Sequence, residues 1–125
     1  MPGLRTGVDL IEIDRFTAAY QRYKQRLLQR LFTTAELKDN GDNMASLAVR
    51  FAAKEAVAKA FHTGIGAVTW QEIEIRRGSA GEPLLHLSGA AKSLADEQHL
   101  HTWSLSLSHT EKHAIAFVVA IGDEE

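Results

Sequence analysis

The sequence predicts an α+β domain with a mainly antiparallel sheet. Residues 44–62 form a long, mostly apolar run that is typical of one buried helix. Residues 103–109 alternate strictly, and residues 113–121 are almost continuously apolar, so both segments are expected to be strands. Only a short turn separates these strands, and we therefore expect a hairpin and antiparallel pairing.

The N-terminal third is expected to hold a strand and two helices. Residues 7–13 read as a strand, because branched and apolar side chains follow a glycine. A first helix should begin near Asp14, a good N-cap. Its core stripe should consist of Phe16, Ala19, Tyr20, Tyr23 and Leu27. Thr33 and Glu36 have the spacing of a capping box, which should start a short second helix that ends near residues 40–41.

The segment after the long helix is expected to alternate between strand and helix. We expect a strand over residues 70–76, a turn over residues 77–81 and another strand over residues 84–87. Ser88 is an N-cap candidate for a last helix that runs to about Glu97.

Composition indicates one compact domain over residues 1–125. Apolar residues make up 45% of the chain and charged residues 24%, as in globular proteins. There is no cysteine, which excludes disulfides and thiolate metal sites. No signal-peptide pattern is visible, and no apolar stretch approaches the roughly 18 residues of a membrane span. We therefore expect a cytoplasmic protein that does not insert into membranes.

The long helix carries four charges in two lines. At about 100° per residue, Arg50 and Lys54 fall on one edge, and Glu55 and Lys59 fall on another edge roughly 140° away. Charges on the flank of a buried helix need a partner or a ligand. The simplest interpretation is a solvated i,i+4 pair between Glu55 and Lys59. Two other segments favour a functional site instead.

These two segments place chemically active side chains on strands. Asp9 interrupts the apolar run of the first strand, where a carboxylate needs a cation, a donor or a metal unless it points to water. His109 and His113 flank the turn of the C-terminal hairpin. A spacing of four would suit zinc on a helix. Because the flanking periodicity is that of strands, we favour a pair of turn histidines without a ligand.

Basic residues gather in the first predicted helix, although the formal net charge of the chain is −2. No Asp or Glu lies between Arg15 and Phe32, and on one helix Arg15, Arg22 and Arg26 would project within about 40° of one another. Such a row suits an acidic partner, and a solvated basic face is the plain alternative. The overall acidity and the lack of an interleaved aromatic platform argue against nucleic acid.

Together these segments resemble the holo-acyl-carrier-protein synthase branch of the phosphopantetheinyl transferases. The family pattern is Gly-x-Asp with an Arg six residues after that Asp, a helix containing Phe-Ala-x-Lys-Glu-Ala-x-x-Lys-Ala, and a strand that ends in Ser-x-Ser-His. In this chain, residues 7–9 and Arg15 match the first part of this pattern. Residues 51–60 match the helix, and residues 106–109 match the end of the strand. The resemblance runs from about residue 4 to residue 121, and the matching segments follow one another in the same order as in the family.

The resemblance implies a phosphopantetheinyl transferase fold, in which a long central helix packs on a mainly antiparallel sheet. It also implies a Mg²⁺-dependent enzyme that transfers 4'-phosphopantetheine from coenzyme A to a serine of apo acyl carrier protein. The other product is adenosine 3',5'-bisphosphate, and the reaction supports fatty acid biosynthesis. This chain departs from the family at two places. His62 stands where many members have Gly, and the segment 39–46 is short. Both departures could alter the entrance of the substrate site.

The resemblance assigns a role to each matching residue. Asp9 and Glu55 would hold Mg²⁺, which prefers carboxylate oxygens and keeps several waters. The catalytic residues would be Glu55, Lys59 and His109. Coenzyme A would be bound by Lys59, Gly64, Pro83, Ser108 and His109. The acidic carrier protein would dock on Arg15, Arg22 and Arg26.

Short members of this family resemble one half of larger duplicated transferases, so the resemblance implies a homotrimer with sites at the subunit interfaces. The sequence is compatible, because residues 113–121 are apolar and Trp103, Leu105 and Leu107 share one face of the partner strand. In the alternative, the long helix covers one face of this hairpin and the helix after Ser88 covers the other.

Two other classes of function are also considered. A metal-dependent hydrolase or nuclease could use the same carboxylate pair, and it would cleave coenzyme A without a carrier protein. A binding module, in which Glu55 and Lys59 form only a salt bridge, would bind no coenzyme A, and Mg²⁺ would not change its melting temperature.

Overall fold

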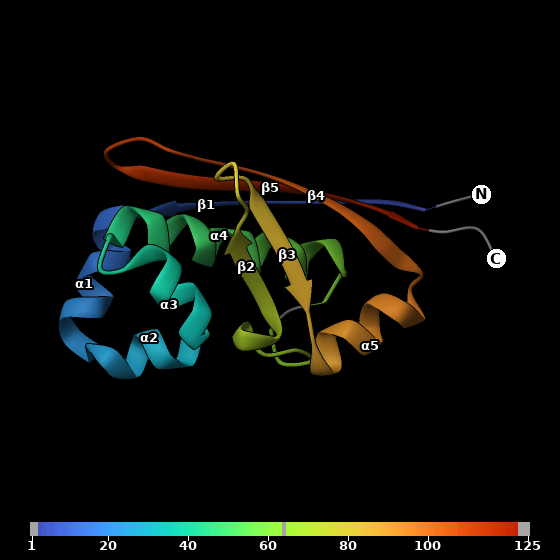
Figure 1. Ribbon diagram of the computed structural model, residues 1–125, viewed down its shortest axis with the longest axis horizontal. Coiled ribbons are helices and arrows are strands. Elements are labelled where there is room, and N and C mark those ends of the chain that lie inside the picture. Colours follow the sequence, from blue (N-terminus) through green and yellow to red (C-terminus); the bar gives the residue numbers. More distant parts are fainter. Residues whose placement is uncertain (1–2, 64, 123–125) are drawn as a thin grey trace.

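The computed structural model describes residues 3–63 and 65–122, which form a sheet layer above a helical layer (Figure 1). The elements in chain order are β1 (Leu4–Glu12), α1 (Ile13–Tyr23), α2 (Gln25–Leu31), α3 (Thr34–Asn40), α4 (Met44–Ala60), the 3₁₀ helix η1 (Trp70–Glu72), β2 (Ile73–Arg77), β3 (Pro83–Leu87), α5 (Gly89–Glu97), β4 (Leu100–His109) and β5 (His113–Gly122). The predicted α+β class and the long central helix are confirmed. No helix in residues 3–63 and 65–122 is long and apolar enough to cross a membrane.

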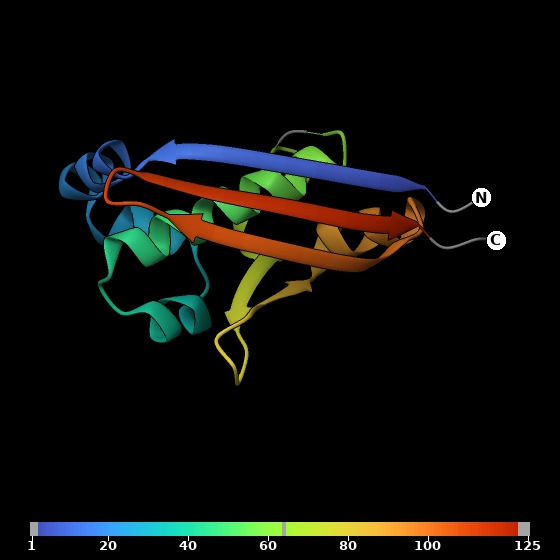
Figure 2. The same ribbon diagram turned by 90° about the horizontal axis from the view of Figure 1, so that it is seen from above.

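The main sheet has three antiparallel strands in the order β1-β5-β4 (Figure 2). The first strand and the predicted hairpin thus meet, and Asp9 pairs with Ala116 of β5. The long helix α4 lies under one face of this sheet (Figure 1). A second, two-stranded sheet, β2-β3, packs along the flank of α4, so α4 contacts both sheets (Figure 1).

Small residues bring α4 very close to the sheet. Ala52 and Ala56 of α4 are fully buried. A Cβ atom added at Gly7 of β1 would lie 1.9 Å from the carbonyl oxygen of Ala56, far inside van der Waals contact. Glycine is therefore required here, because the backbone of α4 lies directly on the strand.

The first predicted helix is in fact two helices. Lys24 has φ of 55° and separates α1 from α2, and its backbone N–H donates to the carbonyl of Tyr20 at 2.6 Å. The predicted continuous stripe is therefore wrong from the end of α1 onward: Phe16 is buried, but Tyr23 is 51% exposed and Leu27 belongs to α2. The predicted row of three arginines on one helix is wrong for the same reason.

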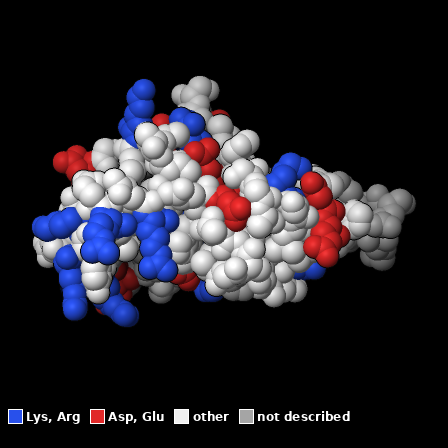
Figure 3. Space-filling view, turned by 90° about the horizontal axis from the view of Figure 1, so that it is seen from below, with Lys and Arg blue, Asp and Glu red and all other residues white. Residues whose placement is uncertain are grey.

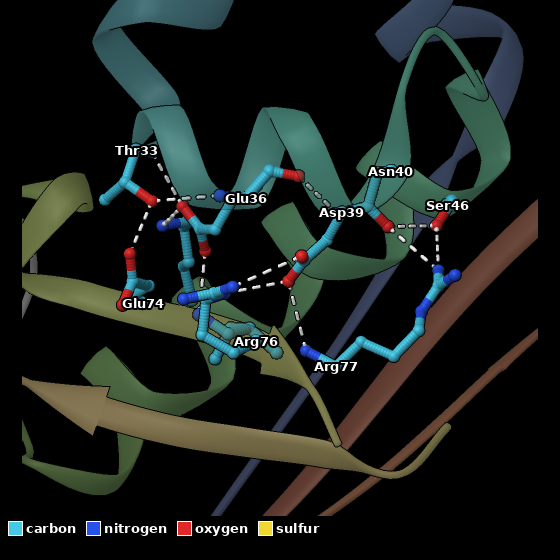
Figure 4. Close-up of polar contacts among 10 residues, drawn as sticks. Thr33, Glu36, Asp39, Asn40, Ser46, Glu74, Arg76 and Arg77 are labelled. Carbon is cyan, nitrogen blue, oxygen red and sulfur yellow. Dashed lines mark hydrogen bonds and ion pairs between the residues drawn. The ribbon is translucent and has the colours of Figure 1, made fainter. Parts of the chain in front are cut away.

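A polar network joins α3, α4 and β2 (Figure 4). The predicted capping box of α3 is present, and Glu36 also accepts hydrogen bonds from Lys54 at 2.8 Å and from the backbone N–H of Ile75 at 2.7 Å. Lys54 donates in addition to the carbonyls of Trp70 and Ile73. The side chains of Glu36 and Lys54 are completely buried. Because these partners satisfy both charges, the pair fastens η1 and β2 to α4.

The predicted strand over residues 70–76 begins later than expected. Thr69 and Glu72 form a second capping box that makes Trp70–Glu72 a 3₁₀ turn, and the strand starts at Ile73. Ser88 occupies the predicted N-cap of α5 but makes no capping bond through its side chain. The carboxylate of Glu72 caps α5 instead, by accepting from the N–H of Ala90 at 2.7 Å.

The outer face of the main sheet carries an exposed apolar surface. Trp103, Leu105 and Leu107 do share a face, but they pack against the core under the sheet. The residues left on the opposite face are Val8, Leu10, Ile115, Phe117 and Ile121, each at least 39% exposed. The helix α5 lies on the same side of the sheet as α4, so it does not cover this face (Figure 1). This corrects the expectation that α5 covers the second face.

Candidate active site

Three predicted site residues meet where α4 crosses β1. Asp9 is on the inner face of β1, and Glu55 and Lys59 are one turn apart on α4. The ammonium of Lys59 lies 2.9 Å from Oδ1 of Asp9 and donates to the carbonyl of Val8, also at 2.9 Å. Among the described residues, Lys59 therefore forms its ion pair with Asp9. The simplest interpretation of the sequence had paired Lys59 with Glu55 instead. Close packing at Gly7, two residues before Asp9, is what brings the helix within reach.

The electrostatics of this cluster favour an added cation. Asp9 is buried, with a side chain 10% exposed, so it does not point to water. Its Oδ2 atom is buried and has no hydrogen-bond partner. Burial raises the pKa of Glu55, and the negative charge of Asp9 raises it further, while Lys59 lowers it. Two carboxylates are therefore held close together with one oxygen uncompensated, an arrangement that a hard cation would relieve.

The donor set fits Mg²⁺ better than a metal that needs a full protein cage. Within the described part of the chain, no group of three or more His, Cys, Asp or Glu side chains could hold a metal ion. A cation at Asp9 and Glu55 would therefore take its other ligands from water and substrate, as Mg²⁺ does. Among the same described residues, His109 and His113 do not belong to any group of three or more such side chains.

A second group of predicted residues lines a cavity elsewhere on the chain. This cavity, of about 380 Å³, lies between α4, the β2-β3 hairpin and the end of β4. It is lined by Pro83, Ser108 and His109, which were predicted, and by Arg50 and Arg77, which were not. Asp9, Glu55 and Lys59 are not among its lining residues. The predicted Gly64 lies outside the described residues.

The basic residues cover one end of the molecule. Lysine and arginine side chains gather at the end formed by α1 and α2, with acidic residues mostly elsewhere on the same face (Figure 3). Arg15 and Arg22 come from α1, and Arg26 comes from α2. Next to Arg15 is an apolar cavity of about 410 Å³, whose wall includes Phe16, Leu27 and Phe51. The break at Lys24 therefore leaves a basic surface, but one spread over two helices around an apolar recess.

Comparison with known proteins decides the family. Residues 5–118 match the 4'-phosphopantetheinyl transferase superfamily. The holo-[acyl-carrier-protein] synthase of Herpetosiphon aurantiacus is 49% identical over 95% of this chain and 99% of its own length. That of Chloroherpeton thalassium is 42% identical over 97% of this chain and its full length. This chain belongs to the holo-[acyl-carrier-protein] synthase family.

Solved structures of holo-[acyl-carrier-protein] synthases share the fold. The Helicobacter pylori enzyme, whose structure is a complex with coenzyme A, superposes with a TM-score of 0.85 at 34% identity, over 92% of this chain and 98% of that one. The Neisseria meningitidis enzyme gives a TM-score of 0.85 at 37% identity, over 93% of this chain and 96% of that one. The predicted resemblance and the predicted enzyme class are confirmed.

Sequence reasoning missed two residues that line the cavity, Arg50 and Arg77. Arg50 was noted only as an edge charge of the long helix, and Arg77 only as the start of a turn. A signal for Arg50 was present, because a guanidinium within an apolar helical run needs a partner. No local pattern pointed to Arg77, whose role depends on the folding of β2 against α4.

Proposed function

We propose that this protein transfers 4'-phosphopantetheine from coenzyme A to a serine hydroxyl of an apo acyl carrier protein, and releases adenosine 3',5'-bisphosphate. The observation that carries the proposal is the cluster of Asp9, Glu55 and Lys59, with its unpaired buried carboxylate oxygen, in a chain of this family. Charge neutralisation and in-line positioning are the main requirements for breaking a pyrophosphate.

Asp9 and Glu55 are the residues that would hold Mg²⁺. When bound, the ion polarises the attacked phosphoryl group and stabilises the charge of the leaving bisphosphate. The free Oδ2 of Asp9 supports this assignment, since Oδ1 is already paired with Lys59. The side chain of Lys59 is 54% exposed, so its ammonium remains accessible to the pyrophosphate as a point charge.

Glu55 is our candidate for the group that accepts the proton of the attacking serine. Burial and the neighbouring charge of Asp9 raise the pKa of Glu55, which makes its carboxylate a stronger base than an ordinary glutamate. Its position on α4, one turn before Lys59, keeps the base beside the ammonium that would face the phosphates. Acceptance of the proton would leave the serine oxygen free to attack the phosphorus.

The cavity at the end of β4 would bind the nucleotide of coenzyme A. Ser108 and His109 supply polar groups, Pro83 supplies an apolar surface, and Arg50 supplies a positive charge. His109 can donate a hydrogen bond to a phosphate from an exposed position. The crystal structure of the Helicobacter pylori enzyme is a complex with coenzyme A, which supports a coenzyme A site in this chain also.

We propose that a second copy of the chain completes each active site, in a homotrimer. Asp9 is on β1 and His109 is on β4, the two opposite edges of the sheet, and the cavity of His109 excludes the carboxylate cluster. The exposed apolar outer face of the sheet is a suitable contact surface between copies. One copy would then present its carboxylates to the nucleotide cavity of its neighbour.

The surface of α1 and α2 would bind the carrier protein. Arg15, Arg22 and Arg26 would attract an acidic partner, and the apolar cavity beside Arg15 could receive an apolar side chain of that partner. Charged residues would then surround a small hydrophobic contact, which is a common arrangement in protein interfaces. We place the activity in the cytoplasm, in support of fatty acid biosynthesis.

Mass spectrometry of an apo carrier protein tests the proposed reaction. After incubation with this protein, coenzyme A and Mg²⁺, the carrier should gain the mass of one phosphopantetheine group, and no gain should occur with EDTA. Cleavage of coenzyme A without a carrier would favour a hydrolase. The absence of any mass gain with several carrier proteins would refute the transferase.

Sedimentation and subunit mixing test the shared site. Sedimentation at micromolar concentration should give about three times the 13.8 kDa chain mass. Inactive Asp9→Asn and His109→Ala variants, mixed under conditions that exchange subunits, should regain part of the activity. A fully active monomer would refute the homotrimer and the shared site.

A further inference from the structure

The end of α4 is a Schellman motif with a histidine at the position that glycine usually occupies. The backbone N–H of His62 donates to the carbonyl of Lys59 at 2.9 Å, and that of Thr63 donates to the carbonyl of Ala58 at 3.4 Å. This pair of bonds places one residue in the left-handed conformation, and His62 has φ of 61°. A side chain is strained in this conformation, whereas glycine is not. The histidine therefore lowers the stability of the fold.

Within the described chain, no contact of the side chain of His62 offsets this strain. The imidazole is exposed and forms no hydrogen bond or ion pair with residues 3–63 and 65–122. It is not needed as a helix cap, because the carbonyl of Ala60 accepts from the guanidinium of Arg5 at 3.0 Å. The carbonyl of Phe61 accepts from the amide of Gln98 at 3.2 Å. A strained residue without an internal partner points to a ligand outside the chain.

His62 lies one turn beyond Lys59, at the C-terminal end of α4. Glu55, Lys59 and His62 follow one another at spacings of four and three, which is the spacing of one helix face. Figure 2 shows this end of α4 and the loop after it beside β1, the strand that carries Asp9. A phosphate here meets the negative end of the helix dipole, so it needs donors that compensate. Lys59 is the basic residue of the last turn, and His62 supplies the next donor.

We propose that His62 binds the pyrophosphate of coenzyme A, an inference that rests on the proposed function. The pyrophosphate must reach Asp9 and Glu55 for its bond to break, and Lys59 would face it from the same side of α4. An imidazole donates a hydrogen bond from one ring nitrogen even when it is neutral. Beside the ammonium of Lys59, this second donor would hold a further phosphoryl oxygen. The contact would thus compensate, in the complex, for the strain of the ligand-free protein.

Stability and affinity should change in opposite directions when His62 is replaced by glycine. Without ligand, His62→Gly should raise the melting temperature by about 2–4 °C, because the strain is removed. In calorimetry, the same variant should bind coenzyme A about tenfold more weakly, the lower end of the range for a hydrogen bond to a charged group. Adenosine 5'-diphosphate carries a pyrophosphate without the pantetheine arm, so its affinity should fall by the same factor. His62→Asn, which tolerates the left-handed conformation but lacks the imidazole, should also bind both ligands more weakly.

The matched control is His99→Gly. His99 has the same left-handed backbone, with φ of 60°, but it follows α5 and precedes β4, at the opposite end of that strand from His109. The control variant should bind both ligands as the wild type does.

Unchanged affinities in His62→Gly would overturn the proposal, as would a lowered melting temperature. A loss of affinity for coenzyme A alone would also overturn it, because the contact would then be with the pantetheine arm. A wild type that binds neither ligand would refute both this contact and the proposed function. Because no transfer is measured, the expected binding results together with a failed carrier reaction would refute the transferase and leave the His62 contact standing.

Discussion

Replacing Gly7 by alanine should separate the two halves of the carboxylate cluster. The added Cβ would lie 1.9 Å from the carbonyl oxygen of Ala56 and 3.1 Å from Cγ1 of Val118. Ordinary contact begins near 3.4 Å, so β1 and α4 must move apart by about 1.5 Å at this point. Asp9, two residues further along β1, would move away from Glu55 with the strand.

The magnitude follows from overpacking and from catalytic geometry. Overpacking a well-filled core costs about 1–3 kcal/mol, which for a domain of this size lowers the melting temperature by roughly 4–12 °C. A displacement of about 1 Å at a catalytic group costs on the order of a hundredfold in rate. The Gly7→Ala variant should therefore remain folded at 25 °C and lose about a hundredfold in kcat/KM.

The assay is the rate of carrier modification by mass spectrometry, measured over a range of Mg²⁺ concentrations, alongside a thermal melt. Gly3→Ala is the matched control, because a Cβ at Gly3 meets no atom within 4 Å, and it should behave as the wild type. The Gly7→Ala variant should also need more Mg²⁺ for half-maximal activity. Normal turnover and Mg²⁺ dependence in a folded Gly7→Ala variant would refute the claim that close packing of α4 on β1 builds the site.

Three further predictions concern charge. Lys54→Met should destabilise the fold by about 3–5 kcal/mol in denaturant titrations because it leaves the carboxylate of Glu36 buried and unpaired, whereas the double variant with Glu36→Gln should lose less; equal losses would contradict the buried pair. The raised pKa of Glu55 means that its contribution to stability is present below the ordinary glutamate range and is lost as pH rises. Without metal, the Glu55→Gln variant should therefore have a higher melting temperature than the wild type at pH 7 but not at pH 4. Mg²⁺ should raise the melting temperature of the wild type only. The opposite pH trend would contradict the burial of Glu55 beside the charge of Asp9. Reversal of Arg15 and Arg22 to Glu should raise the KM for carrier protein and leave the affinity for coenzyme A unchanged, with wild-type carrier binding weakened by salt; salt-independent binding would argue against this surface.

Local signals predicted the elements whose ends are fixed by local chemistry. The capping box of Thr33 and Glu36 and the alternation of the C-terminal hairpin both appear as expected. The same rule could have found the 3₁₀ turn, since Thr69 and Glu72 have the capping-box spacing. The break at Lys24 gave no such signal, because neither glycine nor proline stands there and the apolar periodicity continues across it.

Long-range partners were beyond local reasoning. The pattern of α4 put Lys54 on an edge with Arg50, but its partner Glu36 is 18 residues away and reaches it only through tertiary packing. The family resemblance, rather than periodicity, placed Asp9 beside Glu55. The ion pair of Asp9 with Lys59 depends on the contact of α4 with β1, which no helical or strand pattern specifies.

The pairing of β1 with β5 has a consequence for the order of folding. Asp9 is synthesised long before its sheet partner Ala116. Pairing across such a long sequence separation is slow, so the apolar side chains of β1 stay exposed until β5 has been made. The helices can form meanwhile, but the carboxylate cluster cannot. Metal binding at Asp9 and Glu55 should therefore be acquired in the last step of folding, and a nascent chain lacking β5 would have the motif residues but no site.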